Sequence, residues 1–143
     1  MRFARWLGHC LAVLALAGGG ACALAADPWL DDQPEFLTVD QAFVFDAEVN
    51  ADGSVVARWT MPDGYYLYRE RFGAQTRDGS AVTLAEPLIL PGKEKVDEYF
   101  GAVQVYYHGA ELVVPVTAGK GPTEIGISYQ GCADYGLCYP PET

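Results

Sequence analysis

Short apolar stretches separated by turn residues are the feature that most narrows the fold of this chain. Side chains alternate between two faces in these stretches, and glycine, proline, asparagine or aspartate follows most of them. The expected strands lie at residues 38–49, 54–61, 65–69, 82–84, 88–90, 103–107, 112–117 and 125–129. No segment sustains the 3.6-residue periodicity of an amphipathic helix. About seven or eight short strands therefore predict an all-β, immunoglobulin-like sandwich.

Further predictions concern the segments between the expected strands, the faces of one strand and the end of the sequence. Residues 91–95 are predicted to form a surface loop, and His108-Gly109 a hairpin turn between two strands. In the strand at 65–69, Tyr66 and Tyr68 are expected to share one face because side chains alternate. The chain stops at Thr143, where a further pairing strand is expected, so we predict either part of a longer protein or a sandwich missing its final strand with an unpaired edge.

The first 25 residues are predicted to be a signal peptide. A basic start precedes a short apolar core at 11–17 and an Ala-x-Ala cleavage site at 23–25. The apolar core is shorter than the ~20 residues that span a bilayer. A lipoprotein signal would use Cys22, but Gly19 stands where such signals carry a leucine-like residue. Export with cleavage near residue 25 is the favoured interpretation.

One domain, residues 26–143, remains after cleavage. It keeps two cysteines, one histidine, and seven basic against 19 acidic residues, a net charge of −12. So acidic a surface argues against nucleic acid or an anionic membrane as partner. No apolar run in this domain is long enough to cross a membrane.

The two cysteines, Cys132 and Cys138, could form a structural disulfide or a redox-active pair. They close a ring of about seven residues, which would contribute roughly 2.4 kcal/mol to stability, below the ~3 kcal/mol of a fifteen-residue loop. Glycine, alanine and aspartate between them predict an accessible loop. A switchable dithiol is favoured; the alternative is a secreted binding module whose disulfide is purely structural.

Other chemistry has little support in the sequence. Structural zinc usually needs four cysteine or histidine ligands, and the mature chain offers three at most, so no metal or cofactor is predicted. His108 is the only possible histidine base for a hydrolase, and no orienting motif surrounds it. Residues 97–101 combine two adjacent aromatics with two carboxylates, which suggests a flap covering a site.

Four motifs together carry a family resemblance. They are Gly-Cys-Ala-Asp-x-Gly-x-Cys-Tyr-Pro-Pro-Glu-Thr at 131–143, and the segments 40–43, 63–69 and 97–101. In this order they resemble the N-terminal periplasmic domain of the thiol:disulfide interchange protein DsbD, over essentially the whole mature chain. The resemblance implies a periplasmic protein-disulfide reductase, of which this chain is the N-terminal part, on an immunoglobulin-like fold. It also implies that Cys138 forms the mixed disulfide with partners and that Cys132 resolves it.

The resemblance implies partners and a cap. The electron donor would be the thioredoxin-like domain of DsbD; the acceptors would be periplasmic disulfide isomerases and the thioredoxin-like protein of cytochrome c maturation. Tyr66, Tyr68 and Glu98 correspond to site-lining residues. The corresponding cap loop is Asp97, Glu98, Tyr99, Phe100 and Gly101. Well-known members read Phe then Tyr in this loop, so Tyr99 would take the shielding position here. The membrane segment and C-terminal thioredoxin-like domain of the family are not in this sequence.

The reactivity of the dithiol is expected to depend on the flap. No cationic residue is evident beside the cysteines to lower a thiol pKa, and Asp134, Asp97 and Glu98 would raise it. Our hypothesis is that the free dithiol is sluggish and becomes competent when a partner displaces the flap.

Overall fold

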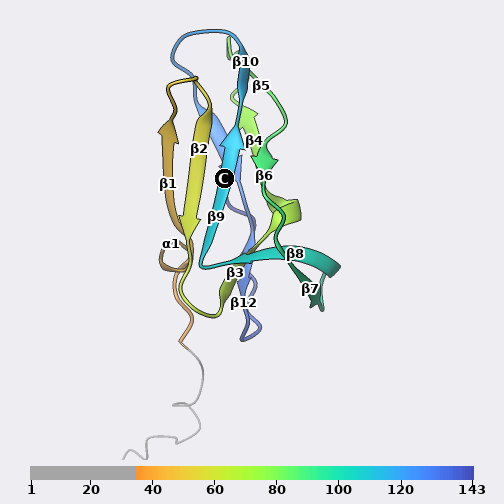
Figure 1. Ribbon diagram of the computed structural model, residues 1–143. Coiled ribbons are helices and arrows are strands. Elements are labelled where there is room, and N and C mark those ends of the chain that lie inside the picture. Colours follow the sequence, from red (N-terminus) through yellow and green to blue (C-terminus); the bar gives the residue numbers. More distant parts are fainter. Residues whose placement is uncertain (1–34) are drawn as a thin grey trace, which may run out of the picture. The chain divides into compact units, whose positions relative to one another are not determined.

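The computed structural model describes residues 35–143, which form an immunoglobulin-like β-sandwich (Figure 1). The predicted all-β fold is thereby confirmed. The predicted signal peptide lies outside the described residues. The first sheet has the strand order β1-β2-β9-β6, and every neighbouring pair is antiparallel. Its strands are β1 (Val44–Val49), β2 (Val55–Thr60), β9 (Gly109–Val114) and β6 (Leu88–Ile89).

The second large sheet, with the order β12-β3-β8-β7, carries the cysteine pair. Its strands are β12 (Gly131–Ala133), β3 (Tyr65–Tyr68), β8 (Gly101–Tyr107) and β7 (Lys93–Asp97). Two further antiparallel pairs complete the strands: β11 (Ile125–Ser128) with β4 (Gly73–Thr76), and β10 (Val116–Ala118) with β5 (Thr83–Leu84).

One predicted strand begins as a helix. Residues 38–49 were expected to be a single strand, but α1 (Val39–Ala42) precedes β1. Gln41 folds back so that its Oε1 accepts the Thr38 backbone N–H at 3.1 Å, and the Ala42 N–H donates to the Thr38 carbonyl at 2.9 Å. These local contacts stabilise one turn, which is too short to show a helical period. A second short turn, the 3₁₀ helix η1 (Arg69–Arg71), follows β3.

Two connections also differ from the predictions. Residues 91–95 were expected to be loop, yet β7 begins at Lys93 and pairs with β8 as the edge strand of its sheet. Its lysines suit an edge because they discourage pairing with another chain. His108-Gly109 was expected to turn a hairpin, but β8 and β9 belong to different sheets. The chain crosses between the sheets at His108, whose φ is 66°.

The main core lies between the sheets and combines aromatic with aliphatic side chains. Trp59 of β2, Leu112 of β9 and Leu67 of β3 are each at most 2% exposed and belong to this cluster. Tyr65 joins them, whereas Tyr66 and Tyr68 pack with Val105 and Cys132 in a second cluster. The predicted alternation along β3 is confirmed. Since all four β3 residues are buried, this strand is covered on both faces, and the second cluster surrounds the cysteines.

Candidate functional site

The cysteine pair lies at the β12 edge of the second sheet. Cys132 lies on β12 directly opposite Tyr66 of β3, and a disulfide joins it to Cys138. Backbone hydrogen bonds from Ala133 to Leu137 (2.7 Å) and from Tyr139 to Gly131 (3.0 Å) close the intervening loop. Gly131 permits the close approach of β12, because a Cβ there would lie 2.4 Å from the Tyr66 carbonyl oxygen.

The two sulfur-bearing residues differ in accessibility. Cys132 is 1% exposed, whereas Cys138 is half-buried and lines a cavity of about 210 Å³. Lys95, Tyr99 and Asp134 line the same cavity. The sequence predicted an accessible loop, which is wrong for Cys132. Cys132 is buried because β12 pairs with β3 and its side chain packs within the second cluster. Cys138 is therefore the more accessible of the two cysteines.

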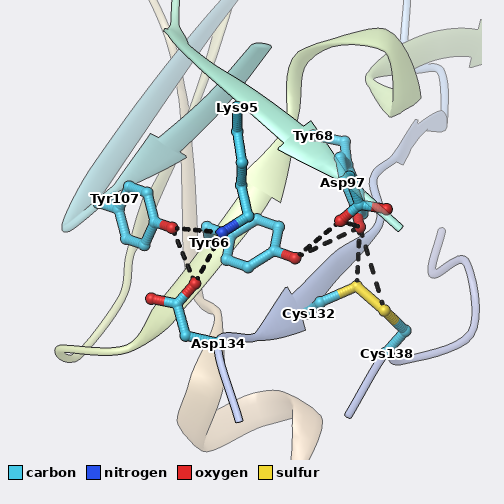
Figure 2. Close-up of polar contacts among 8 residues, drawn as sticks. All are labelled: Tyr66, Tyr68, Lys95, Asp97, Tyr107, Cys132, Asp134 and Cys138. Atoms are coloured by element: carbon cyan, nitrogen blue, oxygen red, sulfur yellow. Dashed lines mark hydrogen bonds and ion pairs between the residues drawn. A yellow bond between two sulfur atoms is a disulfide. The ribbon is translucent and has the colours of Figure 1, made fainter. Parts of the chain in front are cut away.

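Tyr68 connects the sulfurs to a buried carboxylate. Its Oη lies 3.1 Å from Cys132 Sγ and 4.0 Å from Cys138 Sγ, and it donates to Asp97 Oδ2 at 2.7 Å (Figure 2). Tyr66 donates to the same Oδ2 at 3.1 Å. A phenol has one proton, so while Tyr68 donates to Asp97 it presents only lone pairs to the sulfur. The hydroxyl can instead turn toward Cys132 when that sulfur carries negative charge.

Asp97 is the polar centre of the site. It is 7% exposed, and burial alone would raise its pKa. Hydrogen bonds outweigh that effect and lower the pKa: Tyr68 and Tyr66 donate to Oδ2, and the backbone N–H groups of Tyr99 and Phe100 donate to Oδ1 at 2.8 and 3.1 Å. Asp97 is therefore a carboxylate at neutral pH.

Both site tyrosines are held in the protonated form. The pKa of Tyr68 is raised to about 12, chiefly by burial; the hydrogen bond with Tyr66 opposes this shift and the one with Asp97 adds to it. Burial also raises the pKa of Tyr66, and its contacts with Tyr68 and Asp97 act in the same direction. At neutral pH each hydroxyl is a proton donor and neither is a base.

The predicted cap loop lies next to these groups. Asp97 ends β7 and Gly101, with φ of 75°, begins β8, so the three residues between them form the tip of the β7–β8 hairpin. The Phe100 ring packs edge-on against Tyr68 at 5.1 Å, and Arg71 lies 4.3 Å from the Phe100 ring centre. Tyr99 is 58% exposed and lines the cavity with Glu98 and Cys138. Tyr66 and Asp97 also line this cavity, and Tyr68 contacts both sulfurs.

Lys95 is the site residue that the sequence analysis missed. Its Nζ lies in the cavity wall, 3.0 Å from Asp134 Oδ1 and 3.2 Å from Tyr107 Oη. Burial would lower its pKa, but these two contacts raise it, so the ammonium stays charged. No cation was expected here because residues 91–95 were assigned to a loop. Had β7 been recognised as a strand, alternation would have placed Lys95 on the same face as Asp97.

Three further features of the described residues concern metal ligands, His108 and membrane-spanning helices. Among residues 35–143, no group of three or more histidine, cysteine, aspartate or glutamate side chains is arranged to hold a metal ion. His108 is exposed at the crossing between sheets, 3.4 Å from Asp63. In the same part of the chain, no helix has the length and apolar character needed to cross a membrane.

Sequence comparisons match most of the chain to one family. Residues 33–143 match the family model of the N-terminal region of the thiol:disulfide interchange protein DsbD. DsbD of Pseudoalteromonas atlantica is 46% identical over 118 residues, which cover 82% of this chain and 19% of that protein. DsbD 1 of Pseudomonas aeruginosa is 43% identical over 109 residues, covering 76% and 18%. The chain thus spans about a fifth of the length of these relatives.

Solved structures agree with this match. The reduced DsbD N-terminal domain of Neisseria meningitidis superposes with a TM-score of 0.68 at 38% identity, covering 75% of this chain and 84% of that one. A complex between the DsbD and PilB N-terminal domains of the same organism gives a TM-score of 0.64 at 35% identity, with 76% and 83% coverage.

Proposed function

Because the chain belongs to the family of DsbD N-terminal domains, we propose that its Cys132–Cys138 pair carries out thiol–disulfide exchange with partner proteins in the periplasm. The observation that carries this proposal is the asymmetry of the pair. Cys138 lines an open cavity, whereas Cys132 is buried and in contact with a tyrosine hydroxyl. A purely structural disulfide has no need of such a difference, whereas an exchange reaction needs one reachable sulfur and one protected sulfur.

Reduction of the disulfide would proceed in two exchanges. A donor thiolate attacks Cys138 Sγ, so that a donor–Cys138 bond forms as the Cys132–Cys138 bond breaks, and Cys132 leaves as a thiolate. The donor's second thiolate then attacks the donor sulfur of the mixed disulfide and releases the Cys138 thiolate. Two electrons have moved to this domain, and the donor holds a disulfide. The reverse sequence reduces an acceptor, with Cys138 attacking first and Cys132 resolving.

Tyr68 and Asp97 would stabilise the leaving sulfur. Tyr68 Oη, 3.1 Å from Cys132 Sγ, can turn its proton to the thiolate as charge develops there. Asp97 then loses one hydrogen bond and keeps those from Tyr66 and two backbone N–H groups. A hydrogen bond to a charged group contributes about 1.5–3 kcal/mol, which is enough to favour departure of Cys132 over Cys138.

The cap and the surface around the cavity would control access. We infer that Glu98, Tyr99 and Phe100 shield the disulfide until a partner displaces them. Val96 and Tyr99, at the cavity wall, and Tyr135, in the cysteine loop, are 86%, 58% and 71% exposed. Exposed aromatic and aliphatic side chains around a reactive sulfur suit a transient protein contact. The complex formed by the Neisseria relative supports a protein partner.

Membership of the family supports a proposal for the partners and the direction of transfer. We propose that the thioredoxin-like domain of DsbD reduces this domain, and that periplasmic disulfide isomerases and the thioredoxin-like protein of cytochrome c maturation receive the electrons. Export through a signal peptide at residues 1–25 is part of the same proposal, with residues 26–143 as the mature domain.

Trapping of the mixed disulfide tests the proposal. The Cys132→Ala variant should form a stable mixed disulfide with a thioredoxin-like protein through Cys138, because no resolving thiol remains. The Cys138→Ala variant should not, because Cys132 is buried. Equal trapping by the two variants, or trapping by Cys138→Ala alone, would contradict the assigned roles.

A further inference from the structure

A second polar cluster lies beside the disulfide. Lys95 Nζ donates to Asp134 Oδ1 at 3.0 Å and to Tyr107 Oη at 3.2 Å, and Tyr107 Oη donates to the same Asp134 oxygen at 2.9 Å. Figure 2 shows Tyr66 between this cluster and the group formed by Asp97, Tyr68 and the two sulfurs. The three residues Lys95, Tyr107 and Asp134 come from β7, β8 and the cysteine loop.

The ammonium group of Lys95 has three favourable contacts. Two donate to Asp134 and Tyr107, and Nζ also lies 4.6 Å from the centre of the Tyr66 ring. An ammonium carries three donors, so these contacts account for all of them. The side chain of Lys95 is 28% exposed and that of Asp134 38%, which shields the pair partly from solvent. The arrangement fixes the position of Lys95 more closely than a single surface ion pair would.

The cluster joins two segments that line the cavity at Cys138. Lys95 precedes Asp97 by two residues on β7, the strand that leads into the cap. Asp134 belongs to the loop that runs from Cys132 to Cys138. The backbone N–H of Asp134 donates to the Gly64 carbonyl, and its carboxylate accepts hydrogen bonds from Lys95 and Tyr107 of the cap-bearing hairpin.

We propose that Lys95 is a positioning residue of the exchange reaction: through Asp134 it latches the loop between the cysteines to the β7–β8 hairpin. This inference rests on the proposed exchange role of the cysteine pair. The latch fixes the position of the cysteine loop relative to the base of the cap. A partner then needs to move only the cap tip at 98–100. It also holds the loop closed around Cys138 in the absence of a partner.

A latch and a simple charge effect predict different changes in the reaction rate of Cys138 when Lys95 or Asp134 is replaced. If Lys95 acted only as a cation that favours the Cys138 thiolate, Lys95→Met would slow the reaction of the thiol and Asp134→Asn would speed it. If the pair is a latch, either substitution frees the same loop, so both variants change reactivity in the same direction. The double variant then behaves like either single one, because the contact can be lost only once.

The test is alkylation of the dithiol-reduced protein by iodoacetamide across a range of pH. The latch predicts that Lys95→Met, Asp134→Asn and the double variant each raise the plateau rate at Cys138 about threefold, the ratio expected for loss of one partly exposed ion pair. Lys93→Met is the matched control on the same strand; Lys93 is exposed and lies 5.5 Å from the Tyr107 ring centre. Its rate should equal that of the unmodified protein.

Mass spectrometry of the alkylated cysteines separates the latch from general loss of structure. The latch predicts modification of Cys138 with Cys132 still protected, whereas a loosened fold would expose both. Opposite effects of the two single variants, additive effects in the double variant, no change in rate, or joint modification of Cys132 would each overturn the proposal. None of these results bears on whether Cys138 forms a mixed disulfide with a partner, which is tested separately by the trapping experiment.

Discussion

Replacing Asp97 with asparagine should destabilise the fold, because one buried carboxylate accepts four hydrogen bonds. Oδ1 accepts the backbone N–H groups of Tyr99 and Phe100, and Oδ2 accepts the hydroxyls of Tyr66 and Tyr68. Asparagine keeps an oxygen for the two backbone donors but removes the charge. Its amide nitrogen then faces two hydroxyl donors, which must turn to accept.

The size of the effect follows from the change of acceptor. A hydrogen bond to a charged group contributes about 1.5–3 kcal/mol and a neutral one about 0.5–1.5 kcal/mol, so each backbone bond loses roughly 1 kcal/mol. Reversal of the two tyrosine bonds removes a further ~1–2 kcal/mol. The free energy of unfolding at pH 7 should therefore fall by about 3–4 kcal/mol in Asp97→Asn.

The pH dependence of this loss has a defined sign. The pKa of Asp97 in the folded protein lies below its ordinary value of 3.8. The carboxylate therefore contributes its full stability above the unfolded pKa and loses it as the pH falls through the folded pKa. The difference between the unmodified protein and Asp97→Asn should stay constant from neutral pH down to about pH 5 and shrink below about pH 4.

Urea unfolding followed by tryptophan fluorescence measures the effect. The denaturation midpoint of Asp97→Asn is compared with that of Asp78→Asn, a control at an exposed turn position. The control should lie within about 0.5 kcal/mol of the unmodified protein, as is usual for surface substitutions. A loss below 1 kcal/mol in Asp97→Asn, or a difference that grows on acidification, would refute the reasoning.

Three further predictions concern the reactive pair. Tyr68→Phe should slow reduction of the disulfide by a dithiol about tenfold, because the hydroxyl 3.1 Å from Cys132 Sγ is lost. The control variant Tyr106→Phe should leave the rate unchanged. Equal stopped-flow rates for the two variants would contradict this prediction. Tyr99→Ala and Phe100→Ala should each speed iodoacetamide alkylation of the reduced protein, and an unchanged rate for Tyr99→Ala would refute its shielding role. Reduction of the disulfide should lower the urea-unfolding free energy by only about 2 kcal/mol, as expected for a short ring; global unfolding on reduction would contradict this.

Period-two patterning was sufficient to predict the fold class and the strands β2 and β3, whereas the strand predicted at 112–117 is divided between β9 and β10. β2 and β3 lie within the predicted segments, and Tyr66 and Tyr68 share a face as expected. α1 was missed because one turn held by Thr38 and Gln41 has no period to detect. β7 was missed because its charged residues resemble a loop, although at a sheet edge charges are compatible with a strand.

The site was predictable only in part. Its predicted residues were identified through family motifs, and the structure places most of them in or beside the cavity at Cys138. Burial of Cys132 could not be predicted locally, because it depends on pairing with β3 and on packing against residues from distant strands. Lys95 and its contact with Asp134 were missed for a related reason: they are 39 positions apart and meet only when β7 pairs with β8.

The reduction potential of Cys132–Cys138, with folding followed in parallel, tests the central claim most directly. The domain would be equilibrated with glutathione or dithiothreitol redox buffers, and the fraction oxidised compared with circular dichroism at each point. We predict reversible reduction of a still-folded domain, at a potential near those of the thioredoxin-like exchangers, which span about −270 to −120 mV. Resistance to reduction below about −300 mV, or loss of the fold on reduction, would identify a structural disulfide and contradict the proposed exchange function.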